Sequence, residues 1–173
     1  MVNRVLVTAA GLGILLLQIL LSDFLTIRGL RPDFMLIFVI IVSLRSGSLS
    51  GVVAGFSLGL VEDFLSAGSL MGLAPLTKSL TGFMIGRLRG RYITMNPISF
   101  HLIWISVVAI HFFIFIYVNF QSLLEANVLI FWLTYAYAML YTMVFVAAIQ
   151  FIRPFSSIKP CLLYTSPSPR DRG

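Results

Sequence analysis

The sequence predicts an all-α integral membrane protein with about six transmembrane helices. Of the 173 residues, 59% are hydrophobic and only 10% are charged, and the mean hydropathy is +1.01. A soluble domain has roughly 45–50% apolar and about 25% charged residues. The apolar residues also form runs near the length of about 20 residues that one crossing needs, which gives room for about five or six crossings. We therefore expect residues 1–160 to form a single polytopic membrane domain.

The predicted helices are separated by polar residues, glycines and prolines. They cover residues 5–21, 33–44, 48–60 (or 48–64), 70–88, 98–118 and 127–152. The first apolar run follows Arg4 and lacks a clear cleavage site, so we interpret it as an uncleaved helix rather than a signal peptide. Pro32 is well placed to open the second helix, because proline is favoured in a first helical turn. This second helix rises only about 18 Å, which is short for a hydrocarbon core of about 30 Å.

The later helices have similar boundary signals. Pro75 is a candidate for a break in the fourth helix, because proline cannot donate a backbone hydrogen bond. Asn96 and Pro97 have the types expected of the N-cap and first-turn proline of the fifth helix. Residues 119–126 are expected to form a loop, and Asn127 is expected to cap the sixth helix.

Basic residues are concentrated on one side of the predicted bundle. If all six helices cross and the N-terminus is inside, the cytoplasmic basic residues are Arg4, Arg45, Arg87, Arg89, Arg91, Arg153 and Lys159. The external side then has only Arg28 and Arg31. Since cytoplasmic loops are enriched in Lys and Arg, we expect the loop 87–91 and the C-terminus to be cytoplasmic. The N-terminus is cytoplasmic in this arrangement, but external if the second helix does not cross.

The last residues differ abruptly in composition from the rest. Residues 161–173 are rich in serine, proline and arginine, and we expect a disordered, non-native tail that resembles a translated cloning adaptor. Cys161 is the only cysteine, so no internal disulfide can form. The net charge of +6 does not indicate nucleic-acid binding, because the basic residues are scattered between apolar runs rather than gathered on one face.

Glycine recurs at every fourth position in two of the predicted helices. The residues are Gly47, Gly51, Gly55 and Gly59 in the third helix, and Gly82, Gly86 and Gly90 in the fourth. Small residues four apart create a groove that permits close backbone contact between membrane helices. Two interpretations follow: the third and fourth helices pack against each other, or the groove is a docking face for a partner helix. Gly90 is expected to lie past the membrane edge.

Four ionisable residues lie at or near membrane depth: Asp33, Glu62, Asp63 and Lys78. A charge in lipid is costly and usually faces the protein interior with a partner. We expect Asp63 and Lys78 to form a structural ion pair across the third and fourth helices, with a substrate or proton pathway as the alternative. Asp33 follows Pro32 at a helix start, where a carboxylate meets the positive end of the helix dipole.

The sequence contains no recognisable catalytic, cofactor or metal site. A phosphate-binding loop, a nucleophile elbow and zinc-ligand spacing are all missing from it. His101 and His111 are ten residues apart in one predicted helix, which puts them on different faces. We therefore expect a protein that is not an enzyme and that binds no metal and no cofactor.

Two motifs occur in a characteristic order. Residues 31–37 read RPDFMLI, with Pro32, Asp33 and Phe34 opening the second helix, and residues 55–63 read GFSLGLVED at the end of the glycine-spaced helix. A glycine-containing loop from Gly68 to Gly72 follows. In this order and spacing the chain, over about residues 5–152, resembles the MreD family of bacterial rod shape-determining proteins. Gln18 in the first helix also fits that resemblance.

The resemblance implies a six-helix protein of the bacterial inner membrane. It implies a helical arrangement similar to the substrate-binding subunits of vitamin (ECF-type) transporters. In the family, the protein is a non-enzymatic member of the cell-wall elongation (rod) complex that binds MreC. Through that complex it is linked to the actin-like MreB and to the peptidoglycan polymerase and transpeptidase.

Two other functions stay open from the residues alone. One is the substrate-capture subunit of a small-solute transporter, which needs a water-accessible pocket with converging polar groups. The polar candidates for such a pocket are Glu62, Asp63, Thr77, Lys78 and Thr81. The other function is a flippase-like lipid carrier.

Overall fold

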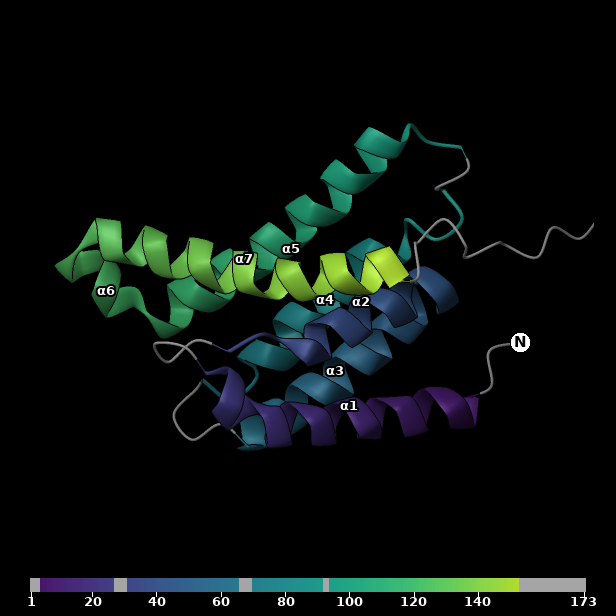
Figure 1. Ribbon diagram of the computed structural model, residues 1–173, viewed down its shortest axis with the longest axis horizontal. Helices are drawn as coiled ribbons and strands as arrows, with labels where there is room; N and C mark the ends of the chain where they lie inside the picture. The colour runs from purple at the N-terminus through teal and green to yellow at the C-terminus, as the bar shows by residue number, and fades with distance from the viewer. Residues whose placement is uncertain (1–3, 27–30, 66–69, 92–93, 153–173) are drawn as a thin grey trace, which may run out of the picture.

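The computed structural model describes residues 4–26, 31–65, 70–91 and 94–152, and these ranges form helices and no strand. The helices are α1 (Arg4–Leu25), α2 (Phe34–Ser46), α3 (Ser48–Leu65), α4 (Leu73–Gly86), α5 (Pro97–Asn119), α6 (Gln121–Ala126) and α7 (Val128–Ile152). The tail 161–173 lies outside the described residues. Figure 1 shows α1 to α4 grouped together, while α5 and α7 run on past them to the short α6.

Capping residues account for several of the helix ends. The Asn96 side chain accepts a hydrogen bond from the backbone nitrogen of Ile98, and Pro97 occupies the first turn of α5. The Asn127 side chain accepts from the backbone nitrogens of Leu129 and Ile130 at the start of α7. These side chains satisfy backbone donors that a helix start otherwise leaves unpaired.

Three boundary predictions are wrong. Pro32, expected in the first turn of α2, lies before the N-cap of that helix, Asp33. Residues 121–126, predicted as part of a loop, form the short helix α6. Pro75 does not break α4, which runs without interruption from Leu73 to Gly86. Pro75 is the third residue of that helix, and in the first turn the N–H group that a proline lacks would have no intrahelical acceptor.

The lengths and surfaces of the helices are those of a membrane protein. In the described part of the chain, three spans are long and apolar enough to cross a bilayer: Ser48–Leu65, Pro97–Asn119 and Val128–Phe151. Large apolar side chains are exposed on the outside of the molecule, among them Phe24 (89% exposed) and Phe151 (92% exposed). Such extensive apolar exposure is unfavourable in water and favourable in lipid.

The short helix α2 lies in the interior. Residues 35–40 and 42–44 of this helix are all buried, with Leu36 and Val39 fully inaccessible. One apolar cluster joins α2 to α4, α5 and α7 and includes Ile40, Ile85 and Phe112. Because other helices surround it, α2 faces protein rather than lipid, and its rise of about 20 Å does not have to match the bilayer thickness.

Candidate functional site

The helices α3 and α4 are in backbone contact along a line of glycines. A Cβ atom added to Gly55 would lie 2.5 Å from the backbone oxygen of Lys78, and one added to Gly59 would lie 2.5 Å from the Cα atom of Pro75. Real Cβ atoms do not approach other heavy atoms this closely. Only glycine therefore permits the two backbones to lie where they do.

The same close contact continues toward the other end of the two helices. A Cβ atom on Gly82 would collide with the backbone of Gly51, and one on Gly86 would collide with the backbone of Ser48. We call this line of contact the α3–α4 seam; its glycines are Gly51, Gly55, Gly59, Gly82 and Gly86. Each helix fills the groove of the other, so a partner helix has no room at these glycines.

Gly47, which the glycine spacing groups with this face, lies at the edge of the seam: its backbone is close to Gly86, but a Cβ atom added to Gly47 itself would meet only the side chain of Arg89. It is the C-cap of α2 and has a φ of 94°, in the left-handed region that favours glycine. Its backbone nitrogen donates to the backbone oxygen of Ser43. Gly47 therefore makes the tight turn from α2 into α3.

A second feature, the polar node, is centred on Lys78 of α4. The side chain of Lys78 is fully buried, and its Nζ atom lies 2.5 Å from Asp33 Oδ2 and 2.6 Å from Glu62 Oε2. Both carboxylates are thus within salt-bridge distance of the ammonium group. The node consists of Asp33, Glu62 and Lys78, and it ties α4 both to the start of α2 and to α3.

The predicted pairing of Asp63 with Lys78 is wrong. Asp63 Oδ2 instead accepts a hydrogen bond of 2.6 Å from the backbone nitrogen of Gly72. Successive helix residues point about 100° apart, so Glu62 and Asp63 cannot face the same neighbour. The structure turns Glu62 toward Lys78 and Asp63 toward the segment that leads into α4.

Asp33 has a second role as the N-cap of α2, which its position after Pro32 predicts. Its Oδ1 atom accepts a hydrogen bond of 2.7 Å from the backbone nitrogen of Leu36. Its backbone nitrogen donates to Thr142 Oγ1 of α7, at 3.3 Å. Its carboxylate thus faces the positive end of the α2 dipole as well as Lys78.

The segment before α2 is also held by α1. Gln18 Nε2 donates to the backbone oxygen of Pro32 at 3.2 Å, and Gln18 Oε1 accepts from the backbone nitrogen of Phe34 at 2.9 Å. These bonds satisfy backbone groups that α2 cannot satisfy itself. The family-type stretch Pro32-Asp33-Phe34 is therefore fixed by α1, α4 and α7 together.

Sequence reasoning missed two side chains next to the node. His111 of α5 is buried, with its Nε2 atom 3.9 Å from Asp33 Oδ2 and its Nδ1 atom 3.3 Å from Thr81 Oγ1. Thr142 of α7 is fully buried. In the sequence, each of these residues is a polar residue within a long apolar run, which indicates a buried polar side chain. The spacing of the residues does not identify the partner of such a side chain.

The described residues hold no group of three or more His, Cys, Asp or Glu side chains arranged to bind a metal ion. The polar atoms of the node are mainly engaged with each other or with backbone groups at helix ends. The node therefore serves to connect α2, α3 and α4 to one another.

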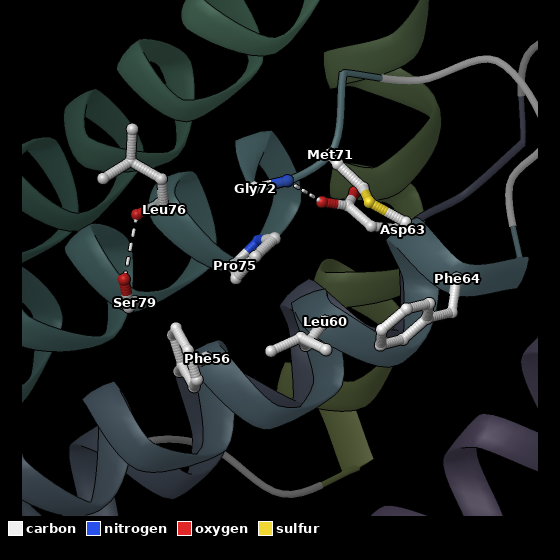
Figure 2. A pocket seen from close by; sticks show the side chains of 9 residues that line it. All are labelled: Phe56, Leu60, Asp63, Phe64, Met71, Gly72, Pro75, Leu76 and Ser79. Carbon is white, nitrogen blue, oxygen red and sulfur yellow. Dashed lines mark hydrogen bonds between the residues drawn. The ribbon is translucent and has the colours of Figure 1, made fainter.

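A groove of about 550 Å³ lies on the outer side of the α3–α4 seam. Figure 2 shows Phe56, Leu60 and Phe64 along the α3 side of the groove, and Asp63 turned toward the backbone nitrogen of Gly72. Of the polar residues considered for a solute pocket, only Asp63 lines this groove; Glu62, Thr77, Lys78 and Thr81 do not. The groove is thus mainly apolar and lacks the converging polar groups of a solute site.

Comparison with known protein families decides the relationship. A family described as rod shape-determining protein MreD matches residues 2–158 of the chain. The chain belongs to the MreD family. The match contains the seven helices of the described residues, the α3–α4 seam and the polar node, so the resemblance inferred from the two motifs is confirmed.

Membership in the MreD family makes the chain a rod shape-determining component of a bacterial membrane. Proteins of this family act as structural components in the determination of cell shape. Comparisons with curated proteins and with solved structures gave no match. The similarity to the substrate-binding subunits of ECF-type transporters therefore stays a prediction.

Proposed function

We propose that this MreD-family protein is a non-enzymatic scaffold of the cell-wall elongation complex in the bacterial inner membrane, where it binds an MreC-type protein. The observation that carries the proposal is the family match over residues 2–158. Through its partner, the chain is linked to an MreB-type filament and to the peptidoglycan polymerase and transpeptidase.

The internal structure suits a rigid membrane scaffold. The seam fixes α3 against α4, and the node fixes the start of α2 against both of them. Discrete ties of this kind hold helices in one arrangement even though lipid gives no hydrophobic drive for their association. The outward faces of the bundle remain apolar and available to the helices of other membrane proteins.

We propose that α1 to α5 and α7 each cross the membrane as parts of one domain, with both termini in the cytoplasm. Arg45 lies at the end of α2, and Arg87, Arg89 and Arg91 lie at or after the end of α4, which is the same end of the bundle. The hairpin end at α6 contains Glu125 and no basic residue. This asymmetry favours a cytoplasmic location for the arginine end.

We expect Thr94→Cys and Ser122→Cys to label from opposite sides of the membrane in a Cys161→Ser background. Both positions are exposed, and they lie at opposite ends of α5. An impermeant maleimide added to intact cells should label Ser122→Cys fully and Thr94→Cys only after permeabilisation. Labelling of Thr94→Cys in intact cells would reverse the proposed orientation.

Depletion in a rod-shaped host tests the function itself. Cells that lose the protein should become round or wide, and supplying vitamins or other nutrients should not restore rods or growth. The measurement is cell width by microscopy, with re-expression of the wild-type chain as the control. Normal rods after complete depletion, or recovery with one added nutrient, would favour a solute-transport function instead.

A further inference from the structure

Four exposed arginines lie at or just after the C-terminal ends of α2 and α4, at one end of the bundle. They are Arg45 in the last turn of α2, and Arg87, Arg89 and Arg91 at and after the C-terminal end of α4. Arg89 Nη1 donates a hydrogen bond of 3.0 Å to the backbone oxygen of Ser46, the residue after Arg45. This bond brings the ends of α2 and α4 together, and with them the arginines that each helix carries. We call these four residues the arginine end.

Arg87 is held at the border between this end and the apolar outer surface. Its guanidinium carbon lies 4.6 Å from the centre of the Phe83 ring, within the range of a cation–π contact. Phe83 and its neighbour Met84 are themselves exposed, at 40% and 38%. The cation therefore lies directly beside exposed apolar side chains, and the N–H groups of its planar fork can reach an external acceptor.

No carboxylate of the described chain lies at this end. The acidic side chains that the structure describes are at the start of α2, in the last turn of α3 and in α6; they are Asp33, Glu62, Asp63 and Glu125. These positions all belong to the opposite end of the antiparallel bundle. Among the described residues, the guanidinium groups therefore have no carboxylate as a counter-charge at this end, which favours binding of an anion.

We propose that the arginine end binds the phosphate headgroup of an anionic phospholipid in the leaflet that it reaches. A lipid matches both halves of the surface, because its phosphate meets the guanidinium groups while its acyl chains contact Phe83 and Met84. A soluble phosphate ion would use only the first half. This inference is independent of the proposed partner and of the orientation in the membrane.

Native mass spectrometry of the purified full-length protein tests this site. The probes are dioleoyl-phosphatidylglycerol, which is anionic, and dioleoyl-phosphatidylcholine, which has no net charge. Wild-type protein should retain more phosphatidylglycerol, and excess inorganic phosphate should not displace it. Equal retention of the two lipids would overturn the proposal. Displacement of the lipid by inorganic phosphate would show that the site takes free anions.

Arginine variants locate the binding. Arg87→Gln should weaken phosphatidylglycerol binding about fivefold, and Arg87→Gln with Arg91→Gln about 25-fold, the factors expected for surface arginines at an anionic leaflet. Arg31→Gln removes the same charge at the opposite end of the bundle and should leave binding unchanged. Each variant is checked for an unaltered melting temperature, and Arg87→Lys, which retains the charge, should bind at an intermediate level. Unchanged binding in a folded double variant, or an equal loss in Arg31→Gln, would overturn the assignment.

Discussion

Replacing Lys78 with methionine should cause the largest loss of folded protein of any single substitution in the interior. The change leaves the largely buried carboxylates of Asp33 and Glu62 without the ammonium group that they share. Breaking a buried ion pair by removing one partner typically costs about 3–5 kcal/mol. We expect the monodisperse peak of detergent-solubilised Lys78→Met to fall severalfold in size-exclusion chromatography, with a lower melting temperature in the fraction that remains.

Two adjacent acidic residues provide a matched control for this prediction. Adding Glu62→Gln to Lys78→Met should recover part of the lost stability, because it removes one unpaired charge, with a coupling energy of about 0.5–3 kcal/mol. Asp63→Asn should show no such coupling, because Asp63 bonds to the backbone of Gly72 instead. Coupling of Lys78 to Asp63 and none to Glu62 would contradict the described node.

Gly55→Leu should separate α3 from α4. Even the Cβ atom of the new side chain would lie 2.5 Å from the backbone oxygen of Lys78, so the two helices would have to move apart. Inserting extra carbons into a well-packed core typically costs about 1–3 kcal/mol. We expect a larger loss here, because the shift also displaces Lys78 from its carboxylates. The melting temperature in detergent measures the effect.

Gly13→Leu is the matched control for this substitution. Gly13 also lies within a long helix, α1, but an added Cβ would meet nothing within 4 Å. The control therefore isolates the effect of close packing from the change in helix propensity, which favours leucine over glycine at both positions. Equal tolerance at the two positions would mean that α3 and α4 are not in backbone contact.

Helix positions were largely predictable because their signals are local. Asn96-Pro97 and Asn127 each mark a helix start through side-chain caps or proline geometry, and these signals need no tertiary information. For α2 the signal is the N-cap Asp33 rather than Pro32, which lies before the cap. The helix α6 was missed because six residues between two long apolar segments have no periodicity that separates a helix from a loop. Repeated glycine spacing likewise pointed to a close contact of α3 and α4, which are neighbours in sequence.

The polar node was only partly predictable, because its partners are distant in sequence. Asp33 and Lys78 are 45 residues apart and meet only when α2 packs beside α4. The order of Glu62 and Asp63 around α3 decides which carboxylate reaches Lys78, and sequence alone does not give the rotation of that helix. For His111 and Thr142, the contact depends on how the α5–α7 hairpin packs onto the other helices.

Affinity purification of the tagged chain from gently solubilised membranes of its host tests the central claim most directly. The proposed scaffold function predicts recovery of an MreC-type protein in stable amounts from wild type and from Gly13→Leu, and its loss from Lys78→Met and Gly55→Leu. Recovery of an ATPase module in place of an MreC-type protein would contradict the claim and identify the chain as part of a transporter.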